Sequence, residues 1–209
     1  MPDTLRYLCE RQIGYSTSLL GFPNLADCMA LVLQNDGGLF GMHLIGGDQG
    51  GKKFAEWIGQ HSGFIQDPKW NAMYVAGFFA KRYGTGQDGD LSSEVAALAK
   101  ALGYRGDVLC YDTVESGLPT STTDSIYVHF QRTGATSVQV HYKRSSKLNT
   151  VSGPGVASSA DHGEITGIGK QTLASNLGYQ VTSVTGKVSL LHSGKMHVFK
   201  GPSKTITVG

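Results

Sequence analysis

A thiol and an imidazole, Cys28 and His43, stand on the two sides of one predicted hairpin. A thiolate, not a thiol, attacks an amide, and a neighbouring imidazolium favours the thiolate by lowering the pKa of the cysteine. The imidazole then protonates the departing ammonia and afterwards activates water to hydrolyse the thioester. The backbone of Asp27 and Cys28 follows a loop, where its N–H groups are placed to stabilise an oxyanion. If the two side chains meet, they have the chemistry to hydrolyse a carboxamide.

Whether Cys28 and His43 meet depends on the register of that hairpin. Residues 28–34 are typical of a buried strand, residues 35–38 of a tight turn, and residues 39–45 of a returning strand. If Asp36 and Gly37 are the central residues of a type I′ turn, paired positions sum to 73, and His43 lies one diagonal step from Cys28 on the same face. A three-residue turn puts the two on opposite faces. Spacing alone favours a packing role for both.

The elements around the hairpin indicate a mixed α/β fold. Hydroxyls, Gly21, Pro23 and Asn24 make residues 16–27 a predicted loop. Apolar periodicity and turn signals predict the other elements. They are a helix over 52–60, a helix from Asp90 that Gly103 ends, a strand over 107–111, and a hairpin of residues 126–132 and 137–143. The apolar run over 70–83 fits a strand or a helix, and a strand ending near Tyr83 is favoured.

The last third of the chain has a different composition. Residues 145–163 are rich in Ser, Gly and Ala and predict a linker or long loop. Residues 164–209 predict a β-rich extension packed on the same body, with a short helical piece over 171–177 and strands over 180–184, 187–192, 195–199 and 204–208. The expected fold class is α/β, an antiparallel-rich β-sandwich flanked by helices.

Composition bounds the functional class. Cys9, Cys28 and Cys110 are an odd number without Cys-x-x-Cys spacing, which argues against a disulfide framework or a zinc ribbon. The net charge is only +2, so the basic face of residues 145–209 is interpreted as solvated, and no nucleic acid partner is expected. No apolar run is long enough to span a membrane, and residues 1–12 hold no signal core. We expect synthesis in the cytoplasm without a signal peptide, with secretion or injection into a target cell left open.

The stretch Asn24 to Lys52 resembles the CheD family of chemoreceptor glutamine deamidases. In that family a Gly-Ser-Cys turn leads into a hydrophobic strand, a Gly-rich turn, a strand carrying Ala-His, a Gly-containing loop and a helix. The order of later elements is also similar, including an acidic-Thr turn at Asp112-Thr113, so the resemblance covers roughly residues 13–144. It implies a deamidase domain over residues 1–144 with the linker and the extension behind it.

The same Cys and His arrangement is shared with the cytotoxic necrotizing factor toxins, which deamidate glutamines in host proteins. The resemblance implies Cys28 as nucleophile, His43 as base, no metal, no cofactor, and a protein substrate carrying a target glutamine, as for a bacterial effector or toxin. The chain departs from the CheD pattern at Ala26-Asp27-Cys28, and has Phe22 where the family keeps a Thr. A third catalytic group is then expected from Ser18 or Thr17, with Ser16 nearby, or from a backbone carbonyl.

Two other functional classes compete with this interpretation. Gly84-Thr-Gly-Gln-Asp-Gly89 matches the dinucleotide-binding motif, although Asp88 and Asp90 would oppose a pyrophosphate. A non-catalytic interaction protein on the same scaffold would explain the replaced Gly-Ser and the basic tail. Histidines that invite a metal site are interpreted as half-exposed strand residues, namely His129, His141, His192 and His197, with Asp161-His162 in the loop. Trp57, Trp70 and Phe78-Phe79 are assigned to the core.

Overall fold

A computed structural model gives the fold of the chain. The structure describes residues 6–8, 12–45, 50–60, 69–84, 88–113, 126–144, 164–165, 180–181, 184–185 and 196–209. The predicted linker over 145–163, the helical piece over 171–177 and the strand over 187–192 lie outside these residues, as do Cys9, Asp161-His162 and His192.

The larger sheet has seven strands in the described part of the chain, in the order β11-β2-β5-β4-β6-β7-β14. Its pairs are antiparallel except for β11 with β2 and β6 with β7, which run parallel. The strands are β2 (Gln12–Ser16), β4 (Met29–Asn35), β5 (Gly38–Leu44), β6 (Ala72–Gly77), β7 (Gly106–Asp112), β11 (Gln180–Val181) and β14 (Lys204–Val208).

The smaller sheet has the order β1-β3-β8-β9-β13. Only β1 and β3 pair in parallel; the other neighbours are antiparallel. The strands are β1 (Arg6–Tyr7), β3 (Leu19–Leu25), β8 (Ile126–Arg132), β9 (Val138–Arg144) and β13 (His197–Val198). A separate antiparallel pair joins β10 (Glu164–Ile165) to β12 (Val184–Thr185).

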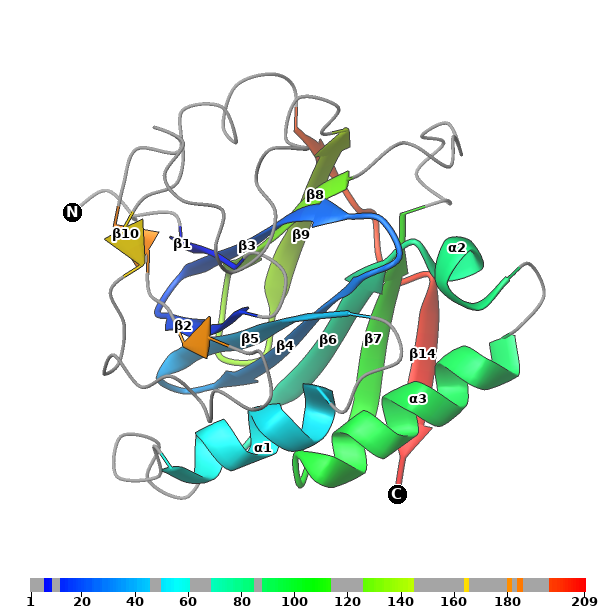
Figure 1. Ribbon diagram of the computed structural model, residues 1–209, viewed down its shortest axis with the longest axis horizontal. Coiled ribbons are helices and arrows are strands. Elements are labelled where there is room, and N and C mark those ends of the chain that lie inside the picture. The colour runs from blue at the N-terminus through cyan, green and yellow to red at the C-terminus, as the bar shows by residue number, and fades with distance from the viewer. Residues whose placement is uncertain are drawn as a thin grey trace.

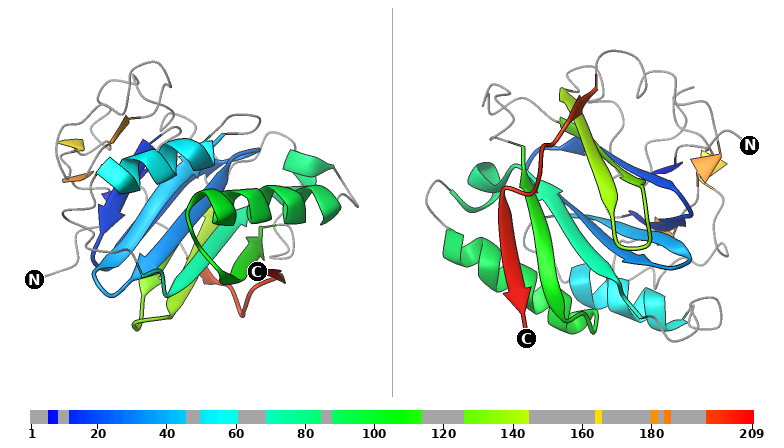
Figure 2. Two further views of the ribbon diagram at one scale, coloured as in Figure 1. Left: turned by 90° about the horizontal axis from the view of Figure 1, so that it is seen from below. Right: turned by 180° about the vertical axis from the view of Figure 1, so that it is seen from behind.

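Two helices, α1 (Gly50–Gln60) and α3 (Asp88–Ala101), cover one face of the seven-stranded sheet, and strands of the smaller sheet cover the other (Figures 1 and 2). A Cβ at Gly51 would lie 2.3 Å from a methyl group of Leu98, so α1 and α3 approach each other closely at this glycine. Gly103 follows α3 with φ +67°, the left-handed conformation that ends helices. The chain is therefore a mixed α/β protein whose sheets are mostly antiparallel, as the sequence predicts.

Alternation along β4 divides the protein into two apolar cores. Met29, Leu31 and Leu33 face the helices, together with Phe54 of α1 and Val95 of α3. The alternate side chains point between the two sheets and pack with residues of β3, β8 and β9. These are Ala30 and Val32 of β4 and Cys28, which directly precedes the strand. Because both faces of β4 are buried, its register is strongly specified.

The hairpin of β4 and β5 has the predicted register. Ala30 pairs with His43, Asn35 pairs with Gly38, and paired positions sum to 73. The turn is not type I′, because Gly37 is not among the glycines with positive φ. Instead, the side-chain oxygen of Asn35 accepts hydrogen bonds from the backbone N–H of Gly37 (2.9 Å) and of Gly38 (3.1 Å). The side chain of Asn35 therefore supports the two-residue turn.

The predicted loop over residues 16–27 is wrong, because most of it is strand β3. Gly21 pairs with His129 of β8, and a Cβ there would lie 2.5 Å from the Tyr127 hydroxyl, so the glycine allows close packing. The register shifts between Phe22 and Leu25, where Pro23 lies. A bulge tolerates a proline because the residue has no N–H to give to the ladder.

The predicted strand ending near Tyr83 is also wrong in its second half. Strand β6 ends at Gly77, and a short helix, α2 (Phe79–Tyr83), follows. A Cβ at Gly77 would lie 3.1 Å from the Cys28 carbonyl oxygen, so β6 approaches β4 closely at this point. The strand–helix boundary thus falls beside the residues that the sequence singles out.

The last strands belong to both sheets. Strand β14 lies antiparallel to β7 at one edge of the larger sheet, and β13 lies beside β9 in the smaller one (Figure 2). The predicted strand over 204–208 is confirmed, and the one over 195–199 is shorter than expected. Residues 196–209 therefore connect the two sheets at one side of the body.

Candidate active site

Cys28 and His43 lie at one end of the seven-stranded sheet, on its face towards the smaller sheet. Cys28 directly precedes β4, while β5, β6 and β7 end here at Leu44, Gly77 and Asp112. His43 is opposite Ala30, one diagonal step from Cys28, a spacing at which Cα atoms are roughly 7–8 Å apart. The structure therefore brings the predicted nucleophile and base to the same face of one hairpin.

The imidazole of His43 is held by a backbone carbonyl. Its Nδ1 lies 2.9 Å from the carbonyl oxygen of Leu8. Since a carbonyl only accepts, Nδ1 carries the proton and Nε2 presents a bare lone pair. Nε2 is buried and has no hydrogen-bond partner among the described residues, so no hydrogen bond joins it to Cys28 in this resting structure. His43 is thus in the tautomer that a general base requires.

Burial makes His43 neutral at physiological pH. The side chain is 0% exposed, and this desolvation lowers its pKa from 6.5 to about 4, although the Leu8 carbonyl and the charge of Asp27 act in the opposite direction. The sequence predicts an imidazolium beside a thiolate. The structure instead has a neutral imidazole, because its lowered pKa lies well below physiological pH.

The nucleophile candidate has an acidic neighbour. The thiol of Cys28 is 3% exposed and lies 4.0 Å from a carboxylate oxygen of the exposed Asp27. That carboxylate accepts from the thiol and opposes formation of a thiolate while attracting a proton towards His43. Asp27 therefore places a negative charge directly beside the sulfur.

The hydroxyl groups predicted as third catalytic group are at the wrong end of the sheet. Ser16 pairs with Leu39 of β5, and Thr17 and Ser18 follow it in the turn to β3. His43 is four residues further along β5, about 13 Å at 3.3 Å per residue. Thr17 and Ser18 therefore do not reach His43.

The described structure instead offers the Leu8 carbonyl, the backbone alternative, as the partner of His43. Phe22 packs its ring edge-on against the imidazole, with ring centroids 6.2 Å apart. Sequence reasoning does not point to Leu8 itself, because a backbone carbonyl leaves no signal in residue type.

The acidic-Thr turn at Asp112-Thr113 lies beside the pair. Gly77 is bonded in register to both Met29 and Asp112, so β4, β6 and β7 reach the same edge. The backbone N–H and the hydroxyl of Thr113 both donate to the Gly77 carbonyl, at 3.0 and 3.2 Å. Thr113 thereby fixes the strand end against which the Cys28 backbone packs.

A buried arginine binds the residue before Cys28. Arg82 of α2 donates from Nη1 to the carbonyl oxygen of Asp27 at 2.8 Å, and its side chain is 5% exposed. The same guanidinium forms an ion pair with Glu94 of α3 at 2.5 Å. Sequence reasoning misses this residue. The only signal is the pair of cations, Lys81 and Arg82, at the end of the mostly apolar stretch that precedes α3.

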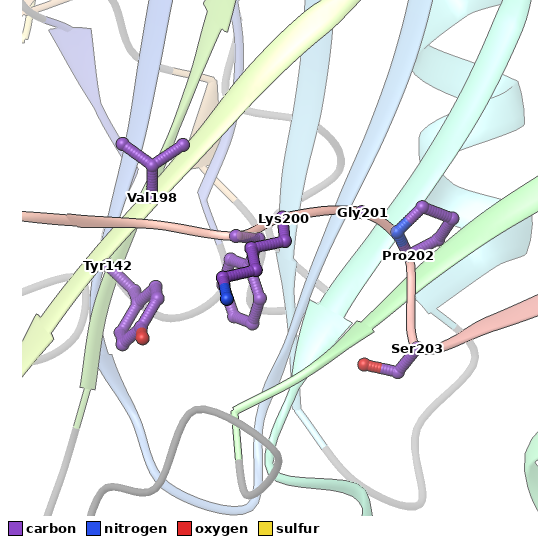
Figure 3. A pocket seen from close by; sticks show the side chains of 7 residues that line it. Tyr142, Val198, Lys200, Gly201, Pro202 and Ser203 are labelled. Carbon is purple, nitrogen blue, oxygen red and sulfur yellow. The ribbon is translucent and has the colours of Figure 1, made fainter.

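A cavity of about 590 Å³ opens elsewhere on the same body, where the chain passes from β13 to β14 (Figure 3). Figure 3 shows Tyr142 and Lys200 on one side of it and Ser203 on the other. Ser203 also fixes the end of β7, because its N–H donates to the Cys110 carbonyl and its hydroxyl accepts from the Asp112 N–H. Neither Cys28 nor His43 lines this cavity among the residues described.

The two histidines of the β8–β9 hairpin lie opposite each other in the strand register. His129 is opposite His141, with ring centroids 4.5 Å apart, and His129 is buried instead of half-exposed as expected. Burial lowers the pKa of His141. Within the described ranges, no three His, Cys, Asp or Glu side chains lie together in a way that could hold a metal ion.

The glycine motif over residues 84–89 does not follow a strand. Strand β6 ends at Gly77, and helix α2 lies between it and the motif. A dinucleotide-binding turn leads directly from a strand into a helix, so the oxidoreductase interpretation lacks its expected layout.

Comparisons with known proteins add no assignment: no family model matches the chain, and no curated protein matches it significantly. Among the helices described, none is long and apolar enough to cross a membrane.

Proposed function

We propose that the chain is a protein-glutamine deamidase of the Cys-His type, in which Cys28 is the nucleophile and His43 the general base. The observation that carries the proposal is the bond from His43 Nδ1 to the Leu8 carbonyl, which leaves a bare Nε2 one diagonal step from Cys28. Nucleophilic catalysis needs a base oriented by a third group, and the carbonyl fills that role.

The reaction proceeds through a thioester. As the Cys28 sulfur attacks the carboxamide carbon of a glutamine, the thiol proton passes to His43 Nε2 and the carbonyl oxygen takes the electron pair. Collapse of this intermediate breaks the C–N bond, and Nε2 returns the proton to the leaving nitrogen, which departs as ammonia. Water then attacks the thioester with His43 as base, giving glutamate and free thiol. Neither a metal nor a cofactor enters these steps.

The resting structure is closed over the pair. With Cys28 at 3% and His43 at 0% exposure, a glutamine side chain reaches the sulfur only after covering groups move aside. Closure keeps water from the imidazole, which is why its pKa is lowered and why it accepts a proton only from the thiol. We therefore place substrate binding before formation of the thiolate–imidazolium pair.

A CheD-like scaffold is part of the proposal. Its support is the order of elements, namely the hairpin of β4 and β5, then α1, β6, α3, β7 and the closing hairpin of β8 and β9, with Asp112-Thr113 at the end that holds Cys28. The substrate is a protein carrying a target glutamine, as for a bacterial effector or toxin. The choice of a protein substrate rests on the resemblance to the CheD and cytotoxic necrotizing factor families.

Ammonia release tests the activity. Wild-type protein incubated with mixed lysate proteins should release ammonia, and Cys28→Ser should release none. His43→Asn, which keeps a donor for the Leu8 carbonyl but has no second nitrogen to accept the proton, should reduce the rate by about 100-fold or more, the contribution of general base catalysis. Release that survives both substitutions places the chemistry elsewhere.

A non-catalytic interaction protein is the second candidate. The observation in its favour is Asp27, whose carboxylate lies 4.0 Å from the Cys28 sulfur and opposes the thiolate. Such a protein gives no ammonia with any substrate. It also keeps its binding partners when Cys28 is replaced, whereas a deamidase should accumulate its substrate as a complex when Cys28→Ser blocks turnover.

A further inference from the structure

We propose that Arg82 is a positioning residue for this reaction, acting through the carbonyl of Asp27 to orient the peptide that joins Asp27 to Cys28. The inference rests on the proposed function, because it assigns a role relative to Cys28. Its starting point is the 2.8 Å hydrogen bond from Arg82 Nη1 to the Asp27 carbonyl oxygen. That bond connects α2 to the loop immediately before the nucleophile.

The guanidinium is itself held by Glu94, whose carboxylate is in turn bonded by Tyr83. Its Nη2 and Nε donate to the two carboxylate oxygens of Glu94, at 2.5 and 3.1 Å, in a bidentate pair. The hydroxyl of Tyr83 donates to the same carboxylate at 2.6 Å. Burial lowers the pKa of Arg82, but the hydrogen bonds and charge of Glu94 outweigh this effect and the pKa is raised, so the cation persists.

Orientation of the Asp27 carbonyl also sets the direction of the Cys28 N–H. The described residues contain no cis peptide, and in a planar trans peptide the C=O and N–H point in opposite directions. A guanidinium that holds the carbonyl on the side of α2 therefore turns the Cys28 N–H away from α2. We assign to this N–H the stabilisation of the oxyanion that forms when the sulfur attacks.

The arrangement needs arginine, not a cation alone. All three guanidinium nitrogens are used, two towards Glu94 and one towards the Asp27 carbonyl. A lysine ammonium is a single point of charge and cannot hold the bidentate pair and the carbonyl at once. An ion pair that only stabilised α2 against α3 would not require the third nitrogen.

Two reagents separate positioning from stability. p-Nitrophenyl acetate acylates a thiol through a tetrahedral oxyanion. The sulfur forms a bond to the carbonyl carbon and its proton passes to His43. The bond from that carbon to the phenolic oxygen then breaks, and p-nitrophenolate leaves. Iodoacetamide alkylates the same sulfur by displacing iodide, without an oxyanion. Loss of a positioned N–H should therefore slow acylation of Cys28 and spare its alkylation, whereas a general loosening of the fold should change both rates.

The variants are Arg82→Met, which removes the bond to Asp27, and Glu94→Gln, which removes the charge of the ion pair with Arg82 but leaves Nη1 on the carbonyl. Mass spectrometry follows modification of Cys28 in the full chain. We expect Arg82→Met to acylate about tenfold to a hundredfold more slowly, approaching the cost of one lost oxyanion donor, with alkylation within about twofold of wild type. Glu94→Gln keeps Nη1 on the carbonyl but holds the guanidinium less firmly, so it should slow acylation less than Arg82→Met does, with alkylation within about twofold of wild type. If Arg82→Met does not fold, the double variant Arg82→Met/Glu94→Gln, which removes the same donor without leaving an unpaired carboxylate, serves the same test.

The outcomes are distinct. Equal loss of acylation and alkylation in the Arg82 variants, or no loss of either, overturns the positioning role while leaving the proposed function intact. A wild-type protein in which p-nitrophenyl acetate does not acylate Cys28 overturns the nucleophile assignment, and the role of Arg82 falls with it.

Discussion

Replacement of His43 by Asn should change how stability depends on pH. Because the pKa of His43 is about 4 in the folded protein and 6.5 without the fold, the unfolded chain binds more protons between these values. The stability that the neutral buried imidazole contributes is fully present above pH 6.5, is lost as the pH falls towards 4, and is constant below that. At ~1.4 kcal/mol per pKa unit, the loss is about 3 kcal/mol.

Urea unfolding of wild type and His43→Asn at several pH values between 7.5 and 4 measures this effect. Carboxylates titrate in the same range, so the relevant quantity is the difference in unfolding free energy between the two proteins, in which shared titrations cancel. We expect this difference to shrink by about 3 kcal/mol between pH 7.5 and pH 4. Parallel curves would mean that His43 is charged or solvated in the folded protein, and the bare Nε2 would lose its basis.

Further substitutions test the surroundings of the pair. Gly41→Ala should lower the free energy of unfolding by about 1–3 kcal/mol in urea titrations, because its Cβ would lie 2.3 Å from a leucine methyl group between the sheets; an unchanged midpoint would contradict the packing. Asp27→Ser should speed alkylation of Cys28 by about fivefold, the effect of ~1 kcal/mol for a charge 4 Å away in water, while Asp36→Ser, at the other end of the hairpin, leaves the rate unchanged. Iodoacetamide at pH 7.5 should modify Cys28 before Cys110, since burial raises the pKa of the Cys110 thiol to about 12; the reverse order would refute the assignment.

The hairpin could be predicted from sequence because its information is local. Two runs of apolar residues around Asn35-Asp-Gly-Gly38 set a two-residue turn, and the turn sets which side chains share a face. The predicted type I′ turn is wrong but the predicted register is correct, because any turn with two residues between Asn35 and Gly38 sets the same strand pairing.

The errors arise where tertiary contacts override residue type. Gly21 and Pro23 favour a loop locally, yet one permits contact with Tyr127 and the other lies at a bulge of β3. The apolar run before Tyr83 fits a strand or a helix and contains both.

The same limit applies to the candidate site. Cys28 and His43 are identifiable by side-chain chemistry, but the partner of His43 is the carbonyl of Leu8, 35 residues away in sequence, and any residue could supply it. Arg82 is 55 residues from Asp27, and its role depends on the packing of α2 beside the β3–β4 loop. Positions of such groups follow from the complete fold and not from spacing.

Mass spectrometry of lysate proteins treated with wild type or Cys28→Ser tests the central claim most directly. Conversion of a glutamine to glutamate adds one dalton to the peptide that contains it. We predict that wild-type protein produces this gain at one glutamine or a few, and that Cys28→Ser and His43→Asn produce none above the untreated lysate. A gain that persists with Cys28→Ser, or a complete absence of gain with wild-type protein in lysates from producer, rival and host cells, would contradict the deamidase assignment.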